Sequence, residues 1–249
     1  GNLAEDAARP MVGQRTRSPG PTKPHKLSPA ENNSWRQSIQ RDWRALGNAP
    51  LVVRMDTRSV LEALKQDYRA LQFAAEPVRA DKSFVLQAIQ TSSGLTLQFA
   101  TEDVRQDREV VMEAVRIAGL AIRYAFYQRD REDPEVVREA VKNDWRAMEF
   151  ASNALKADKE MGLFAIEQSW ETIQFLDEEL QADREVVEAA LRQDGQALRF
   201  ASDKLRADPH LVAAAGEGGW QVVTEGNDTV LQLRTQGITW APPHHPTSP

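Results

Sequence analysis

The chain has 249 residues, of which 41% are hydrophobic and 27% are charged, and its formal net charge at pH 7 is −6. These values suit a protein with a continuous apolar core, and no run approaches the roughly 20 apolar residues that a transmembrane helix needs. The lack of cysteine excludes disulfide bonds, thiolate zinc sites and cysteine nucleophiles.

The first segment, residues 1–30, is rich in Pro, Gly, Ser and Arg and has too few apolar side chains to fold alone. We predict an extended N-terminal arm, which is basic because residues 1–34 have a net charge of +2 and the remainder has −8. The sequence starts at Gly1 and shows no signal-type segment, which suggests a processed or trimmed chain. We expect an intracellular protein in a compartment that the sequence does not identify; an organellar location after removal of a targeting segment is the alternative.

A repeat of 25 or 26 residues begins after the arm. Asp107-Arg-Glu-Val-Val aligns with Asp133-Pro-Glu-Val-Val and Asp183-Arg-Glu-Val-Val, and this register extends in both directions. The predicted repeat starts are Glu31, Asp56, Asp81, Asp107, Asp133, Asp158, Asp183 and Asp208.

Each repeat is predicted to contain two short helices. The aspartate at the start is a favoured N-cap, and Pro134 and Pro209 suit the first helical position. A second capping residue recurs eleven positions later and predicts a second helix; these residues are Asp42, Asp67, Asp144, Ser169 and Asp194.

Such short helices need neighbours, because isolated helices of fewer than about 12 to 15 residues barely form in water. Every repeat carries a small residue seven positions after its start, and a bulky aliphatic residue follows it in all but the last. We therefore predict an all-α, α-solenoid-like array of about eight 25-residue two-helix repeats over residues 31–223.

The repeat resembles the family known as domain of unknown function 4116, which occurs in protist, algal and some bacterial proteins. The resemblance covers about residues 56–210 and is clearest at Asp133–Ala157 and Asp183–Ala207, in the pattern Asp-x-Glu-Val-Val-x-x-Ala-Val/Leu-x-x-Asp-x-x-Ala-Leu/Met-x-Phe-Ala-Ser. It implies the repeat architecture, and it brings no established activity or functional residues. Residues 31–55 and 208–223 are divergent ends.

The last segment, residues 224–249, is predicted to be a C-terminal cap and a Pro-rich tail. Its stretch from Thr229 to Arg234 fits either a capping helix or a short strand. We expect the two terminal segments to clasp other subunits of a larger assembly.

The sequence carries no recognisable catalytic motif: a Walker loop, a dinucleotide-binding glycine fingerprint and a nucleophile elbow are all missing. The four histidines are His25, His210, His244 and His245, and the adjacent pair is better explained as solvated tail residues than as metal ligands. We expect no enzyme activity, no metal and no cofactor. An unfamiliar active site would need residues that deviate from the repeat, as in Ser92–Gly94, Phe126–Arg131 and Gly216–Gly219.

Aromatic residues recur twelve positions after the repeat starts, each at the expected beginning of a second helix. These possible partner-binding residues are Trp43, Tyr68, Trp145, Trp170 and Trp220. They fit a partly exposed ladder that binds a partner, but we favour the alternative that they cover the crevice between neighbouring repeats. Gly119 and Gly195 interrupt the series.

We expect a non-catalytic protein–protein interaction module, an accessory or scaffold subunit that contacts other protein subunits through its repeat surface and terminal arms. Single-stranded RNA binding is an alternative, because some helical repeats read one base per unit. A reader of this kind needs a basic track, which the acidic repeat region does not favour. The other alternative is an enzyme with an unrecognised site.

Overall fold

The structure is a computed structural model that describes residues 27–125, 128–217, 220–225, 228–233 and 239–240. Over these residues the predicted helical repeat array is confirmed. Seven repeats each contain a long α-helix, a six-residue 3-10 helix and a short α-helix, and the eighth contributes one long helix. Most of the predicted N-terminal arm and Pro-rich tail lies outside the described residues.

The helices follow the chain order in a fixed cycle. The long helices are α1 Pro29–Arg41, α3 Thr57–Leu64, α5 Lys82–Thr91, α7 Arg108–Ile117, α9 Pro134–Asn143, α11 Lys159–Gln168, α13 Arg184–Leu191 and α15 Pro209–Glu217. The 3-10 helices are η1 Trp43–Asn48, η2 Tyr68–Phe73, η3 Gly94–Phe99, η4 Gly119–Tyr124, η5 Trp145–Phe150, η6 Trp170–Phe175 and η7 Gly195–Phe200. The short helices are α2 Leu51–Arg54, α4 Glu76–Arg79, α6 Glu102–Arg105, α8 Gln128–Glu132, α10 Asn153–Lys156, α12 Glu178–Gln181 and α14 Asp203–Arg206.

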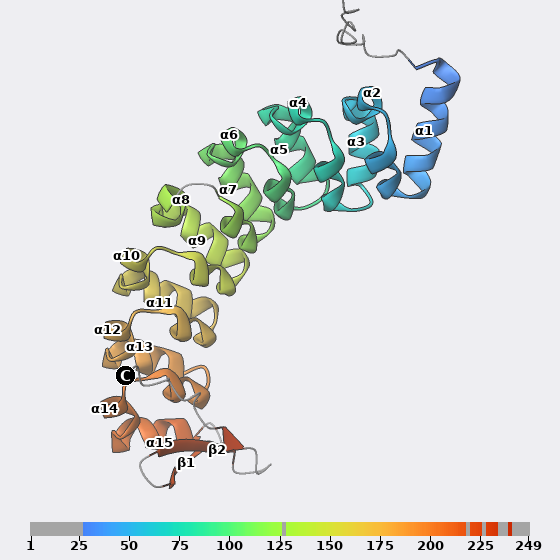
Figure 1. Ribbon diagram of the computed structural model, residues 1–249. Helices are drawn as coiled ribbons and strands as arrows, with labels where there is room; N and C mark the ends of the chain where they lie inside the picture. The colour runs from blue at the N-terminus through green and yellow to red at the C-terminus, as the bar shows by residue number, and fades with distance from the viewer. Residues whose placement is uncertain (1–26, 126–127, 218–219, 226–227, 234–238, 241–249) are drawn as a thin grey trace, which may run out of the picture.

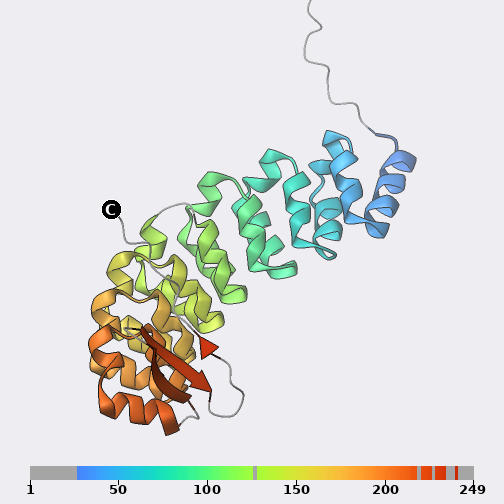
Figure 2. The same ribbon diagram turned by 60° about the horizontal axis from the view of Figure 1, so that its bottom comes forward.

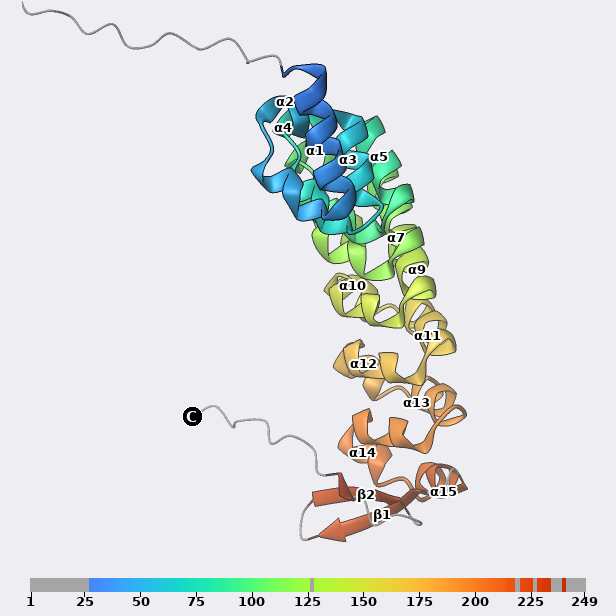
Figure 3. The same cartoon turned by 90° about the vertical axis from the view of Figure 1, so that its right-hand side faces the viewer.

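The repeats stack side by side into a curved array from α1 to α15 (Figure 1). The short helices follow the outer edge of the arc, where the long helices also begin. The 3-10 helices and the C-terminal ends of the long helices form the opposite, inner edge. A view from the side separates the row of long helices from the row of short ones (Figure 3).

Aspartate side chains begin seven of the long helices, as predicted. The Asp133 carboxylate, for example, accepts hydrogen bonds from the amides of Glu135 and Val136 at 2.9 and 3.4 Å. Such bonds satisfy N–H groups that have no partner within the helix. The other capping aspartates are Asp56, Asp81, Asp107, Asp158, Asp183 and Asp208.

The first long helix begins earlier than the predicted start at Glu31. Its N-cap is Ser28, whose hydroxyl accepts a hydrogen bond from the Glu31 amide at 3.3 Å, while the Glu31 carboxylate accepts one from the Ser28 amide at 2.8 Å. This reciprocal pair is a capping box. It moves the start of the helical domain from residue 31 to Pro29 and shortens the predicted arm.

The second half of each repeat contains two helices where one was predicted. Between η5 and α10, Ala151 and Ser152 are extended, with φ and ψ of −62° and 155° and of −64° and 158°. The Ser152 amide donates to the Arg131 carbonyl of the preceding repeat at 3.0 Å. Because this amide bonds to a neighbouring repeat and not within its own helix, the helix is interrupted here. Equivalent bonds join Ala75 to Arg54, Thr101 to Arg79, Asp177 to Lys156 and Ser202 to Gln181.

The core consists of apolar side chains that successive repeats bury against one another. The alanine seven positions after each aspartate start is fully buried, and so is nearly every aliphatic residue that follows it. The buried residues form two clusters that meet within α5. Phe84 and Ala88 belong to the N-terminal cluster, and Val85 and Ile89 belong to the C-terminal one.

Ion pairs link the starts of successive long helices along the outer edge. The Arg108 guanidinium lies 2.7 Å from the Asp133 carboxylate and also pairs with Glu135. Lys82 and Arg184 pair in the same way with Asp107 and Asp208. Lys159 contacts both Asp183 and Glu185. The capping carboxylate of one repeat is thus also the ion-pair partner of the repeat before it.

The pKa of Asp133 reflects these contacts. Burial raises the pKa of this carboxyl, but hydrogen bonds from Arg108 and from the amides of Val136 and Glu135 outweigh burial and leave the pKa below its ordinary value. The charged form is therefore the one that the fold stabilises.

Replacing Asp133 with alanine should lower the free energy of unfolding by about 1 kcal/mol at pH 7, the usual cost of a lost N-cap. Because the native pKa lies below that of an aspartate in the unfolded chain, about 3.9, this stabilisation is complete above that value and is lost as the pH falls through the native pKa. Urea unfolding should therefore show a smaller difference between wild type and Asp133→Ala at pH 3 than at pH 7. A difference that does not shrink would contradict the capping role.

Three strands follow the last helix. β1 Trp220–Glu225, β2 Asp228–Leu233 and β3 Thr239–Trp240 form an antiparallel sheet in the order β1-β2-β3. The sheet lies at the C-terminal end of the array, where β1 contacts α15 (Figure 2). Of the two possibilities for the stretch that begins at Thr229, the strand is the one found over the described residues, which end at Leu233. The predicted boundary at residue 223 falls inside β1, because the helical part ends at Glu217.

Candidate functional site

The aromatic positions lie at the inner edge of the array. Trp43, Tyr68, Trp145 and Trp170 each open a 3-10 helix, at η1, η2, η5 and η6. Trp220 does not, because it begins strand β1. Among its described residues the eighth repeat has no second helix, so the prediction that Trp220 begins one is wrong.

Each of these four rings packs against a phenylalanine of the next repeat. The ring centroids of Trp43 and Phe73 are 5.7 Å apart, and those of Trp145 and Phe175 are 5.9 Å apart. The corresponding distances are 6.3 Å for Tyr68 with Phe99 and 6.4 Å for Trp170 with Phe200. Aromatic pairs at such distances stabilise the contact between repeats beyond the area they bury.

The aromatic side chains differ in exposure. Trp43 is buried, with 8% of its surface exposed, whereas Tyr68, Trp145 and Trp170 are half-buried. Their rings therefore cover the crevice between repeats with one part and face solvent with another. Packing between repeats is therefore found at these four positions, and binding of a partner stays a prediction.

Arginine side chains stack on several aromatic rings of the inner edge. The Arg199 guanidinium carbon lies 5.7 Å from the Trp170 ring centroid and 4.5 Å from that of Phe200. Arg123 lies 5.4 Å from the rings of both Tyr124 and Phe150. A guanidinium group over an aromatic face is attracted by the negative potential of that face.

Ion pairs fix two further arginines at this edge. Arg69 and Arg146 bond to Asp67 and Asp144, the carboxylates that cap η2 and η5, at 2.5 and 2.7 Å. The hydrogen bond from the arginine is the main reason that the pKa of each aspartate lies below its ordinary value. We call the four half-buried aromatic residues Tyr68, Tyr124, Trp145 and Trp170, with Arg69, Arg123, Arg146 and Arg199, the aromatic–arginine edge.

Amide side chains clamp neighbouring repeats just behind the aromatic–arginine edge. The Gln66 Oε1 accepts a hydrogen bond from the Trp43 amide at 3.1 Å, and its Nε2 donates to the Ile39 carbonyl at 2.7 Å. Gln193 makes the same two bonds to Trp170 and Ile166. One side chain thus bonds to two backbone groups of the neighbouring repeat: a carbonyl near the end of the long helix and the first amide of the 3-10 helix that follows it.

Glycine replaces the aromatic residue at the start of η3, η4 and η7, and at Gly94 and Gly119 the next repeat leaves no room for a side chain. The Gly119 amide donates a hydrogen bond to Asn143 Oδ1 at 2.7 Å. Asn143 thus plays the part that Gln66 plays for Trp43, with a side chain shorter by one methylene group. A Cβ atom at Gly119 would lie 2.2 Å from the Ala140 carbonyl oxygen, and one at Gly94 would lie 2.0 Å from that of Ala114. These two glycines divide the aromatic–arginine edge into an N-terminal and a C-terminal part.

Charge is distributed unequally between the edges. The inner-edge segments, residues 40–49, 65–74, 90–100, 116–125, 142–151, 167–176 and 192–201, contain ten Lys and Arg against seven Asp and Glu. The remainder of residues 27–217 contains 15 Lys and Arg against 26 Asp and Glu. The inner edge is therefore the less acidic surface of an acidic protein.

The irregular segments offer little for catalysis in the described part of the chain. The Ser93 hydroxyl caps η3, and the Ser92 hydroxyl bonds to the Ala88 carbonyl and Thr96, so both serines have structural roles. Residues 126–127 and 218–219 of the other two segments lie outside the described residues. Within the described residues, no three histidine or acidic side chains gather to hold a metal ion, and no helix has the length and hydrophobicity to cross a membrane.

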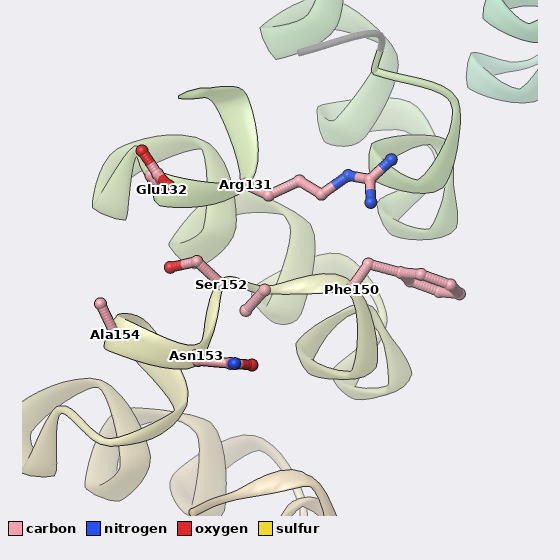
Figure 4. A pocket seen from close by; sticks show the side chains of 7 residues that line it. Arg131, Glu132, Phe150, Ser152, Asn153 and Ala154 are labelled. Carbon is pink, nitrogen blue, oxygen red and sulfur yellow. The ribbon is translucent and has the colours of Figure 1, made fainter. Parts of the chain in front are cut away.

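A hollow of about 540 Å³ lies between α8 and α10 (Figure 4). Arg131 and Phe150 extend in one direction along it, away from Glu132 and Ala154. Glu132 is the one carboxylate among its lining residues, so they do not supply the pair of carboxyl groups that acid–base catalysis commonly uses.

One protein family matches the chain. The sequence model of the family described as Domain of unknown function (DUF4116) matches four times, at residues 56–103, 81–128, 133–181 and 158–206. Every match begins at one of the capping aspartates and spans two successive repeats. No curated protein and no solved structure matches the chain.

Proposed function

Since the chain belongs to the DUF4116 family, whose matches follow the repeats and not one catalytic centre, we propose that it is a non-catalytic protein-binding module. In this role it is an accessory or scaffold subunit of a larger assembly, and it binds a partner protein along its inner edge. The observation that carries the proposal is the aromatic–arginine edge, which is partly exposed and repeats along the array.

The residue types of this edge suit protein recognition. Tryptophan, tyrosine and arginine are the side chains most enriched among residues that dominate binding energy at protein interfaces. Here Trp145 and Trp170 are already held by the phenylalanines of the next repeat, and Arg146 is held by Asp144. Side chains ordered before binding lose less conformational entropy when a partner arrives.

The shape and charge of the inner edge favour an extended partner segment. A segment running along the array meets the same aromatic offset in repeats one and two and again in repeats five and six, and extended concave surfaces of this kind are what solenoid proteins use for binding. Because the inner edge is the least acidic surface of the array, it is the surface on which an acidic or neutral segment experiences the least repulsion.

Single-stranded RNA is a weaker candidate for the same surface, although stacked aromatic and arginine side chains also suit bases. Arg69 and Arg146 are neutralised by Asp67 and Asp144. The seven acidic residues of the inner edge leave little net positive charge to attract phosphates.

Site-specific photo-crosslinking in cells of the native source tests the proposal. Benzoylphenylalanine would replace Arg146 at the inner edge and, as the matched control, Glu179 on α12 at the outer edge, both of which are exposed. We expect a protein adduct from position 146 that is absent from position 179. A nuclease-sensitive adduct would support RNA binding instead, and a protein adduct only from position 179, or none, would contradict the proposal.

A further inference from the structure

The short helix of the first repeat carries an apolar surface that the other short helices lack. Leu51, Val52 and Met55 are 52%, 37% and 47% exposed. These three residues, which we call the α2 patch, lie on the outer edge and are separate from the aromatic–arginine edge.

Residues at these three positions of the short helix are exposed in other repeats too, but they are large and apolar only in the first repeat. The corresponding residues of five other repeats are also at or near the surface. They are Glu76, Pro77 and Ala80; Glu102, Asp103 and Gln106; Asn153, Ala154 and Ala157; Glu178, Glu179 and Ala182; and Asp203, Lys204 and Ala207. A large aliphatic side chain occurs at none of these fifteen positions, so the position of the α2 patch at the end of the array does not by itself explain it.

We propose that the α2 patch is covered by the chain's own segment before Leu27, through Met11 and Val12. The described chain begins next to the patch: Leu27 packs on the N-terminal core cluster, and two views place the start of α1 beside α2 (Figures 1 and 3). Met11 and Val12 are the one pair of adjacent large apolar residues in residues 1–26.

The reach of the segment is sufficient. Val12 lies fifteen positions before Leu27, and an extended chain of that length spans up to about 50 Å. A segment joined to the surface it binds also has an effective local concentration of the order of millimolar. A small patch can therefore be occupied by a tethered segment.

The size of the patch argues against a second copy of the chain as its occupant. Stable interfaces between proteins bury about 800 Å² on each partner and use about 20 to 30 residues a side. The α2 patch offers three side chains, and the corresponding positions of the next two short helices, α4 and α6, carry the charged residues Glu76, Glu102 and Asp103.

The acidic residues on the next short helices of the outer edge complement the charge of the segment. Residues 1–26 contain five basic residues, among them Arg9, Arg15 and Arg17 on either side of Met11 and Val12, and two acidic ones. An apolar pair flanked by arginines fits an apolar patch on an edge whose following short helices carry carboxylates.

Crosslinking through introduced cysteines tests the proposal, because the natural chain has none. The full chain would carry Val12→Cys with Val52→Cys, and the control would carry Val12→Cys with Glu179→Cys, which occupies the same position of a distant repeat. With a short bismaleimide at low protein concentration, we expect an intramolecular crosslink at least ten times faster in the first pair than in the control.

A second variant shows whether the apolar contact is responsible. Adding Leu51→Glu and Met55→Lys to the first pair should slow the crosslink at least fivefold while thermal unfolding stays nearly unchanged, because both side chains are exposed. Equal rates in the two cysteine pairs, or no effect of these charges, would overturn the proposal. Crosslinks that join two chains and grow with protein concentration would overturn it in favour of a second copy.

Discussion

A single methyl group at position 94 should destabilise the array by about 3 kcal/mol, at the upper end of what overpacking usually costs. In Gly94→Ala the new Cβ would lie 2.0 Å from the carbonyl oxygen of Ala114 and 2.9 Å from its carbon. Both atoms belong to the main chain of the next repeat and cannot rotate away. The methyl group therefore fits only if the two repeats move apart.

A matched control is available at Gly216 in α15, where an added Cβ meets no atom within 4 Å. Gly216→Ala should leave stability unchanged or raise it by up to about 1 kcal/mol, because alanine is the better helix former. Urea unfolding of both variants and the wild type measures the contrast. Equal stability of Gly94→Ala and the wild type would show that repeats three and four do not pack as described.

Truncating Met148 to alanine should cost about 2 to 5 kcal/mol, as for other large-to-small changes in cores. Met148 lies in η5 with none of its surface exposed. Its side chain belongs to the C-terminal core cluster, so its loss leaves a cavity between repeats. Phe150→Ala should cost less, because Phe150 is only half-buried.

The control for Met148→Ala is Ile117→Ala at the end of α7, where the side chain is 42% exposed. Its cost should be clearly smaller than that of Met148→Ala, because a large part of the removed surface is already in contact with water. Chemical unfolding followed by circular dichroism gives all three values. A Met148→Ala variant as stable as Ile117→Ala would be inconsistent with the described core.

The repeat period and the helix starts could be predicted because the residues that determine them are local. Asp133 caps a helix through amides two and three residues away, so its position in the sequence identifies the start. The interruption of the second helix could not be predicted in this way. It depends on the bond from the Ser152 amide to Arg131 in another repeat, and no pattern within one repeat reveals that bond.

In the candidate site, too, positions could be predicted from the sequence but contacts between repeats could not. The offset of Trp145 identified a residue at the inner edge, but its partner Phe175 lies thirty positions later in a separate repeat. The contacts of Gln66 were missed for the same reason. One signal could have indicated the arginines, since Arg44, Arg69 and Arg146 directly follow the aromatic residues of their repeats.

The division of the core within α5 has a consequence for how the protein opens. Inter-repeat ion pairs join repeats one and two through Arg36 and Asp56, and they continue from Lys82 onward. Among the ion pairs of the described residues, none joins repeats two and three. This junction is held instead by the ring pair Tyr68–Phe99 and by the hydrogen bond from the Thr101 amide to the Arg79 carbonyl. A linear array can unfold in blocks, and a block that opened at this junction would carry away the first two repeats with their aromatic pair Trp43–Phe73 intact.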